Sequence, residues 1–327
     1  VAQVAEDLIN RGEIKPLILV FPYSGGVAPV GGSSFYSDGG LGSYESYVVS
    51  ALIPAIESQY NVDRFKIGVS GISMGGYGAM KFALKYPSLF TSVCSHSAPL
   101  DLTKLLDPAI LSRIAQENSR LTPSGRIFAS RLDSLDFANS GGYLSVVAIS
   151  MSANWTPESN CSDGRFLSPL LTDPAGYTLA SVGIACPGAP TYKAVLGFQF
   201  PILFDGAGGA SVDQNNMDCG FYDDDDPQDD GSGFNILPQC RNYDAKLTAL
   251  GIAHRYVEYP GAHATQTYYH IDDDLRWHNA AFYTLPEPAA APVNGGVSLR
   301  LAPSRPAITT MPQRALDHLA MVMTASR

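Results

Sequence analysis

Along the first hundred residues, two hydrophobic patterns follow each other in turn. One is a continuous apolar run of strand length, and the other is an apolar stripe at helical spacing. The segment "KPLILVFP" (15–22) is a continuous apolar run of strand length, as expected for a strand buried on both faces. Residues 44–60 place apolar side chains on one helical stripe, which predicts an amphipathic helix, and "FKIGVSG" (65–71) predicts a second strand. A helix that ends near Pro87 and a short strand at 91–95 follow. This alternation of buried strand and helix predicts a parallel sheet covered by helices on both faces.

The pattern is lost over residues 101–198, which we interpret as a cap-like excursion of helices and loops. It returns with the predicted strand "FPILFDG", a helix at 241–251, the strand "HRYVEYPG" and a helix near Trp277. We therefore expect one main domain at 1–285, which contains the cap and an acidic loop at 206–233. A Pro/Ala-rich linker at 286–312 and a tail at 313–327 complete the chain, with one strand, "VSLRLA", and one short helix, 312–325, expected beyond the main domain.

The charge of the chain is concentrated in one segment. The 327 residues carry a formal net charge of −10, but residues 213–239 hold eight Asp and no Lys or Arg, so the remainder is close to neutral. This balance argues against a nucleic-acid partner. The longest apolar runs are too short to span a bilayer, so we expect no membrane span.

The five cysteines suggest an exported protein. Cys94 lies in an apolar run and is interpreted as a buried free thiol, whereas the other four lie in polar, loop-like sequence. Two disulfides, Cys161–Cys186 and Cys219–Cys240, would suit a secreted or periplasmic protein, although pairing cannot be deduced from sequence. The first residues contain no basic region followed by an apolar region, so no signal peptide is visible in this sequence.

The segment "GISMG" places Ser73 between Gly71 and Gly75, directly after a predicted strand and before a helix. A serine on a tight strand-to-helix turn needs small neighbours, because side chains crowd the strained backbone there. This context is typical of a nucleophile elbow, which exposes the serine hydroxyl at the end of a sheet. The backbone amide of Met74 would then donate to the oxyanion.

A nucleophilic serine requires a base, and the chain order of this fold is serine, acid, histidine. His263 lies in "EYPGAHATQ", just after a predicted strand, and is our candidate base. His96 comes before the acid and is interpreted as a buried, satisfied histidine; His270 and His278 are weaker candidates. The residues themselves leave the acid open among the aspartates of one segment: Asp205, Asp213, Asp218, Asp223 to Asp226, Asp229 and Asp230.

Three segments, "LINRGEIKPLILVFP", the long block around Ser73 and "LTALGIAHRYVEYPGAHA", resemble the esterase D family of α/β-hydrolases over residues 1–100 and 195–280. That family includes S-formylglutathione hydrolases, feruloyl and acetyl-xylan esterases, siderophore esterases and mycolyltransferases. The resemblance implies an α/β-hydrolase fold, a mostly parallel central sheet with flanking helices and a cap insertion. It also implies hydrolysis of carboxylic or thioesters by a Ser–Asp–His triad without a metal cofactor. By position, the nucleophile is Ser73, the base His263 and the acid Asp230, with Asp229 and Asp213 as alternatives.

The sequence departs from that family in three ways. The family has an earlier strand and His-Gly loop that supply a second oxyanion donor. We expect these N-terminal strands to be missing here, which would leave "KPLILVFP" and "FKIGVSG" either separated by a gap or paired directly. The acid loop carries an Asp-rich insertion, and the tryptophan that often follows the base is delayed to Trp277.

These departures leave more than one function open. A serine esterase acting on a small-molecule or carbohydrate-linked ester is the leading hypothesis. An acyltransferase with the same acyl-serine intermediate is the second hypothesis, and a hydrolase-fold binding module is the third. The acidic loop partly matches a calcium pattern at Asp226, Gln228, Asp230 and Gly231, but Leu237 replaces the expected Glu, so a solvated loop is favoured.

Overall fold

A computed structural model describes residues 1–23, 34–39, 42–86, 88–100, 108–121, 144, 147, 214–220, 236–249, 254–261, 263, 267–283 and 319–325. The chain divides into two compact units. The first comprises residues 1–23, 51–101 and 202–327 and contains the large sheet; the second comprises 24–50 and 102–201. In the second unit, strands β2 (Asp38–Gly39) and β3 (Gly42–Ser43) pair in an antiparallel hairpin, and helices α2 (Tyr44–Ser46) and α5 (Pro108–Leu121) are present.

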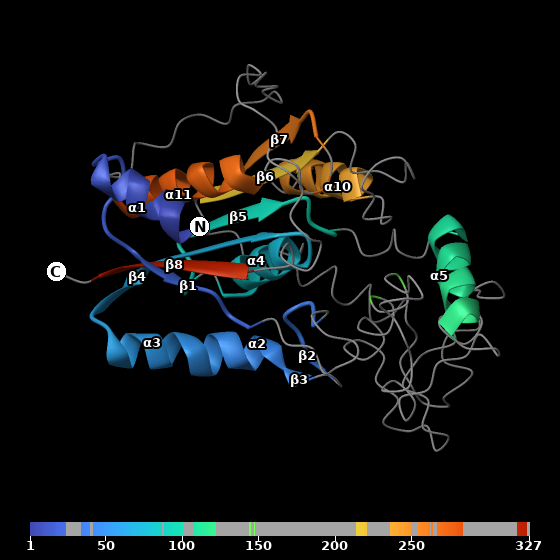
Figure 1. Ribbon diagram of the computed structural model, residues 1–327, viewed down its shortest axis with the longest axis horizontal. Helices are drawn as coiled ribbons and strands as arrows, with labels where there is room; N and C mark the ends of the chain where they lie inside the picture. Colours follow the sequence, from blue (N-terminus) through green and yellow to red (C-terminus); the bar gives the residue numbers. More distant parts are fainter. Residues whose placement is uncertain are drawn as a thin grey trace. The chain divides into compact units, whose positions relative to one another are not determined.

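In the residues that the structure describes, the sheet of the first unit has six strands in the order β1-β8-β4-β5-β6-β7 (Figure 1). Strands β4 (Val62–Ile72), β5 (Ser92–His96), β6 (Gln214–Gly220) and β7 (Arg255–Tyr259) are parallel neighbours. Their carboxyl ends therefore lie at one edge of the sheet, where ligands bind in open α/β sheets. This is the mostly parallel sheet that the alternation of the sequence predicted.

The position between β1 (Ile18–Val20) and β4 is filled by β8 (Leu319–Ala325), which runs antiparallel to both neighbours. Met323 faces Ile18 on one side and Ile67 on the other. Two sequence predictions are therefore wrong: the buried strands neither pair directly nor leave a gap, and residues 319–325 of the expected tail helix are a strand. Pairing with both neighbours satisfies backbone groups that a helix would leave unpaired on β1 and β4.

Helices cover both faces of the sheet (Figure 1). On one face, α1 (Ala2–Asn10) and α11 (Thr267–Tyr283) form a hydrophobic core with β8, and this core includes Leu8, Leu275 and Val322. On the other side lie α3 (Ile53–Gln59) and α4 (Met74–Lys85), and helix α10 (Ile236–Ala249) packs against β6. Every side chain of α4 from Met74 to Leu84 is buried. The end of β4 is thus packed against a fully buried stretch of helix.

The predicted helix at 44–60 is interrupted by a π-helical segment, η1 (Tyr47–Leu52), between α2 and α3. Pro54 lies at the start of α3 and has no N–H to donate to residue 50, which favours a wider turn before it.

Strand β6 occupies part of the segment that we predicted to be the acidic loop at 206–233. That prediction is wrong for residues 214–220, because "QNNMDCG" pairs with β5 and β7 and buries Met217, Asp218 and Cys219. The preceding segment "FPILFDG", the predicted strand "VSLRLA" and the partial calcium pattern lie outside the described residues.

The cysteines of the described segments are free thiols, which confirms the interpretation of Cys94 and contradicts the predicted Cys219–Cys240 disulfide. Cys219 is buried in β6, and Cys240 is buried in α10, where its Sγ donates to the carbonyl oxygen of Ala98 at 3.5 Å. Both thiols pack as small apolar groups between sheet and helix. Cys161 and Cys186 lie outside the described residues. None of the described helices is long and apolar enough to cross a membrane.

Candidate active site

Ser73 occupies the single-residue turn between β4 and α4 with φ 55° and ψ −124°. A non-glycine residue with positive φ is strained, and the strain is retained only where the surrounding structure enforces it. Here the amide of Ser73 donates to the carbonyl oxygen of His96 at 2.9 Å, and the Ser73 carbonyl accepts from the amide of Tyr77 at 3.0 Å. The strand-turn-helix geometry predicted for an elbow is therefore present, and Met74 is the first residue of the helix.

Close packing of backbone explains the glycines around Ser73. A Cβ on Gly71 would collide with the carbonyl group of Gly75 and would lie 2.7 Å from the amide nitrogen of Gly76. A Cβ on Gly76 would lie 2.9 Å from both the Ala98 Cβ and the Gly71 carbonyl oxygen. Strand and helix therefore approach each other more closely here than any side chain would permit.

The candidate base, His263, lies in a turn beyond the carboxyl end of β7 and is 1% exposed. Strands β4 and β7 are three positions apart in the sheet, which corresponds to about 14 Å. The chain crosses this distance after β7, because α11 packs against β5 and β4. His263 belongs to the segment that makes this crossing. Asp230, the candidate acid, and its alternatives Asp229 and Asp213 lie outside the described residues.

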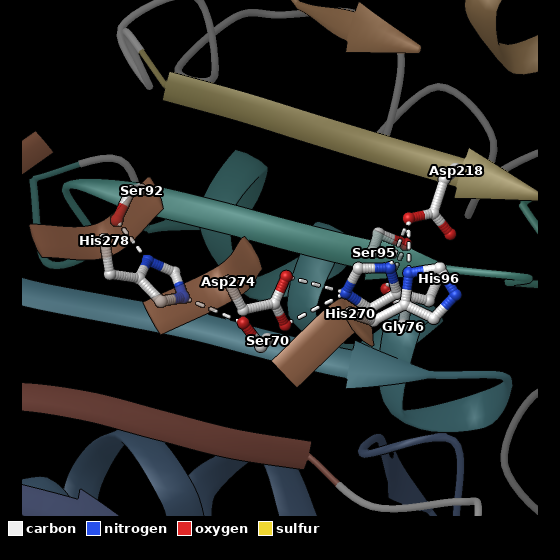
Figure 2. A network of polar contacts seen from close by, with 9 residues as sticks. All are labelled: Ser70, Gly76, Ser92, Ser95, His96, Asp218, His270, Asp274 and His278. Carbon is white, nitrogen blue, oxygen red and sulfur yellow. Dashed lines mark hydrogen bonds and ion pairs between the residues drawn. The ribbon is translucent and has the colours of Figure 1, made fainter. Parts of the chain in front are cut away.

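A buried polar network runs along β5 and α11, from His96 at the carboxyl end of β5 to Ser92 at its start (Figure 2). His96 Nδ1 lies 2.8 Å from Asp218 Oδ2, and His96 Nε2 lies 2.8 Å and 2.9 Å from the two carboxylate oxygens of Asp274. His270 Nδ1 lies 3.0 Å from the same Asp218 Oδ2. The interpretation of His96 as a buried, satisfied histidine is confirmed, because it is 4% exposed and both ring nitrogens are bonded.

The carboxylates of the network determine its electrostatics. Burial alone would lower the pKa of His96, but the negative charges of Asp218 and Asp274 outweigh burial and hold this pKa well above its ordinary value. Burial would raise the pKa of Asp218, yet His270 and His96 hold it well below its ordinary value. The pKa of Asp274 is likewise lowered against burial, chiefly by His96. The network is therefore a set of mutually dependent charges in a low-dielectric environment.

The far end of the network contains a neutral histidine. His278 Nε2 lies 2.8 Å from Ser70 Oγ, and its Nδ1 lies 2.6 Å from Ser92 Oγ (Figure 2). Burial lowers the pKa of His278 to about 4; Asp274 opposes this effect and His96 adds to it. His278 thus ties α11 to β4 and β5 without carrying charge at neutral pH.

Sequence reasoning included Asp218 among the open acids, but it did not foresee that Asp218 joins His96 and His270. The only available signal was the position of these residues near the carboxyl ends of neighbouring strands and on the last helix. His96 and Asp218 are register partners in β5 and β6, which no local pattern reveals.

Comparison with known proteins identifies the family. A model of the family described as "Putative esterase" matches residues 1–169, which is just over half of the chain. This chain belongs to that family. The resemblance inferred from the block around Ser73 is therefore confirmed at the level of the esterase family, and with it the α/β-hydrolase fold.

Two curated relatives are esterases of Mycobacterium tuberculosis, Esterase Rv1288 and Esterase MT1326. Each is 38% identical over 92 residues, which is 28% of this chain and 20% of the relative. This chain therefore spans about a fifth of the length of these relatives.

Solved structures with related folds include a ferulic acid esterase, with TM-score 0.48, 18% identity, and coverage of 86% of this chain and 76% of that chain. The fluorophosphonate-binding serine hydrolase FphF of Staphylococcus aureus matches with TM-score 0.43 and 14% identity, over 76% of this chain and 68% of that one. An S-formylglutathione hydrolase from Agrobacterium tumefaciens matches with TM-score 0.38 and 15% identity, over 77% and 64% of the respective chains.

Proposed function

We propose that this protein is a serine esterase that hydrolyses carboxylic or thioesters through an acyl-serine intermediate. The observation that carries the proposal is the conformation of Ser73, which holds positive φ between a buried strand and the first turn of α4. Such a turn holds the hydroxyl at the end of the sheet, and strain of this kind is typical of catalytic nucleophiles.

In the proposed mechanism, His263 accepts the hydroxyl proton while Ser73 Oγ attacks the ester carbonyl carbon. The amide of Met74, at the N-terminus of a 12-residue helix, donates to the oxyanion. His263 then gives the proton to the leaving alcohol or thiol, and the carbon–oxygen or carbon–sulfur bond breaks. Water, deprotonated by His263, attacks the acyl-serine and releases the acid and free Ser73.

Two observations support His263 as the base. His263 follows the carboxyl end of β7, and this end lies on the same side of the sheet as the carboxyl end of β4. His263 also lies in the segment that leads from β7 back toward β5 and β4. Asp230 remains the proposed acid that orients it. The substrate proposed for this site is a small-molecule or carbohydrate-linked ester, and the same acyl-enzyme could pass its acyl group to an alcohol acceptor in place of water.

An exported location also remains a proposal. It now depends on Cys161 and Cys186, since Cys219 and Cys240 are free. Peptide mapping after alkylation without reductant tests it, because a Cys161–Cys186 disulfide would leave both of these cysteines unalkylated.

A fluorophosphonate probe and a panel of p-nitrophenyl esters test the assignment. We expect wild type to be labelled at Ser73, and Ser73→Ala to lose labelling and to fall by several orders of magnitude in kcat/KM. Labelling that persists in Ser73→Ala would disprove the nucleophile. No labelling of folded wild type would favour a binding module.

Matched histidine variants test the base. His263→Ala should cost nearly as much as Ser73→Ala, and the double variant should add little, because members of a triad act as a unit. The control is His270→Ala, because His270 also contacts a buried carboxylate, that of Asp218. If His270→Ala were the more damaging change and abolished the acidic limb of the pH–rate profile, the base would be His270 with Asp218 as its acid.

A further inference from the structure

His96, Asp218 and His270 come from three separate elements and converge on one buried point. His96 ends β5, Asp218 lies in β6, and His270 is in the first turns of α11 (Figure 2). Their potential donor atoms all lie within 4.8 Å of one another. The rings of His96 and His270 stack with centroids 4.6 Å apart, so both present Nδ1 to the same carboxylate oxygen, Asp218 Oδ2.

The contacts of His96 require a cation. A neutral imidazole has one N–H and one bare lone pair, yet His96 has a carboxylate within 2.9 Å of each ring nitrogen. If Nε2–H donates to Asp274, the lone pair of Nδ1 faces an oxygen lone pair of Asp218 at 2.8 Å. Some positive species must therefore lie between Nδ1 and Oδ2. A proton on His96 Nδ1 can serve for that contact, and a neutral His270 can donate its Nδ1–H to the same oxygen. One divalent metal ion would serve both contacts at once.

The buried carboxylates and one buried carboxylate oxygen also favour a bound cation. Asp218 and Asp274 are both buried, and the residues that the structure describes provide neither carboxylate with a lysine or arginine partner. Within the described part of the chain, Asp218 Oδ1 is buried and has no hydrogen-bond partner. Two neutral histidines, two carboxylates and one divalent cation would form a cluster with no net charge, which lowers the cost of burial.

The donor set fits a divalent transition-metal ion. Imidazole nitrogen and carboxylate oxygen bind such ions at about 2.0–2.2 Å, which places adjacent donors of an octahedral ion about 3 Å apart. The separations of 2.8 Å and 3.0 Å from Asp218 Oδ2 to the two Nδ1 atoms match this edge length. A carboxylate on the distal nitrogen of a metal-binding histidine fixes the tautomer, and Asp274 stands in that place on His96 Nε2.

We propose that His96 Nδ1, His270 Nδ1 and the Asp218 carboxylate form a binding site for a divalent first-row transition-metal ion, with Asp274 as the second-shell acceptor. The ion would join β5, β6 and α11 directly behind the elbow, since the His96 carbonyl accepts the Ser73 amide. Its role is structural. The proposed ester hydrolysis needs no metal, so the two proposals are independent.

Cobalt titration of the full chain, after chelator treatment and dialysis, tests the site. We expect visible Co²⁺ absorption bands that saturate at one ion per chain, and a rise in melting temperature with Co²⁺ or Zn²⁺. His270→Ala should lose the bands, and Asp274→Asn should weaken Co²⁺ affinity about 10–100-fold, as removal of a second-shell partner does. The matched control is His254→Ala, which breaks a His–Asp pair elsewhere, with 2.8 Å between His254 Nε2 and Asp244 Oδ1.

Two outcomes would overturn the proposal. If folded wild type gives no Co²⁺ bands and no rise in melting temperature, the cluster holds protons only. If His270→Ala, shown to be folded by circular dichroism, keeps the bands of wild type, the ion binds elsewhere. Neither readout uses ester hydrolysis, so failure of the esterase proposal would leave this test unaffected.

Discussion

The neutral histidine at the far end of the network makes stability depend on pH in a defined window. We predict that acidification from pH 6.5 to about pH 4 destabilises the protein through His278, and that His278→Gln removes this component. The ring is 0% exposed and lies between Ser70 and Ser92, whose hydroxyls satisfy a neutral imidazole by donating to one nitrogen and accepting from the other. A second proton on this ring would place a positive charge in the interior of the protein.

The magnitude follows from linkage between proton binding and folding. The pKa of His278 is about 4 in the folded chain, against 6.5 for an ordinary histidine in the unfolded chain. Between these values the unfolded chain binds a proton that the folded chain does not, so the free energy of unfolding falls as the pH falls. At 1.36 kcal/mol for each pH unit, the full loss is about 3 kcal/mol, and the loss between pH 6.5 and 5 is about 2 kcal/mol.

The charged neighbours of His278 act outside this window. The pKa values of Asp218 and Asp274 lie below that of an ordinary carboxyl, so the stability that they contribute is lost only as the pH falls below about 4. The pKa of His96 lies well above 6.5, so its contribution is complete below pH 6.5 and is lost as the pH rises. Among the groups of this network, the window from 6.5 to 4 therefore isolates His278.

Urea unfolding of wild type and His278→Gln between pH 7 and pH 4.5 measures the effect. Glutamine can still donate to one serine and accept from the other, but it does not titrate. The variant can be less stable at every pH, so the informative quantity is the difference between the two pH profiles. We expect wild type to lose about 2 kcal/mol more than the variant between pH 6.5 and 5. Parallel profiles would refute the reasoning.

Three further outcomes are expected. Met323 is fully buried in β8, so Met323→Ala should lower the free energy of unfolding by about 2–5 kcal/mol. Met323→Leu, which keeps most of the side-chain volume, should lower it by less than about 1.5 kcal/mol. A loss below about 0.5 kcal/mol for the alanine variant would contradict the position of β8 in the sheet. Gly71→Ala should abolish fluorophosphonate labelling of Ser73, because the new Cβ would collide with the Gly75 carbonyl and displace the turn. Alkylation of denatured protein without reductant should modify Cys219 and Cys240, and recovery of these two cysteines unmodified would restore the predicted disulfide.

Strands with a strong apolar pattern were predicted correctly, and those without one were missed. The second half of β4 is fully buried and β1 is partly buried, and the apolar runs in both segments indicated strands from the sequence alone. Strand β6 reads "QNNMDCG" and has little β-propensity of its own. Its conformation is imposed by pairing with β5 and β7, and such tertiary pairing regularly outweighs local preference.

Strand β8 shows the same competition between local and long-range interactions. The segment "LAMVMTA" contains Ala, Leu and Met, which favour helix, and this composition led to the predicted short helix. In the folded protein it lies between β1 and β4, about 300 residues away from β1 in sequence. Pairing with β1 on one side and β4 on the other therefore outweighed the helical preference of its composition.

The strained turn at Ser73 was predictable because its requirements are local, whereas the buried network of histidines and carboxylates was not, because it depends on register. Gly71, Ser73 and Gly75 are adjacent in the chain, and the turn that they form constrains all three. His96 shows what chain order leaves out. Order assigned it no catalytic role, yet its carbonyl accepts a hydrogen bond from the Ser73 amide while its side chain is held between Asp218 and Asp274. Because both ring nitrogens of His96 are held by carboxylates, its backbone is held in place as well. The buried charges therefore stabilise the strained turn of Ser73 through the carbonyl of His96.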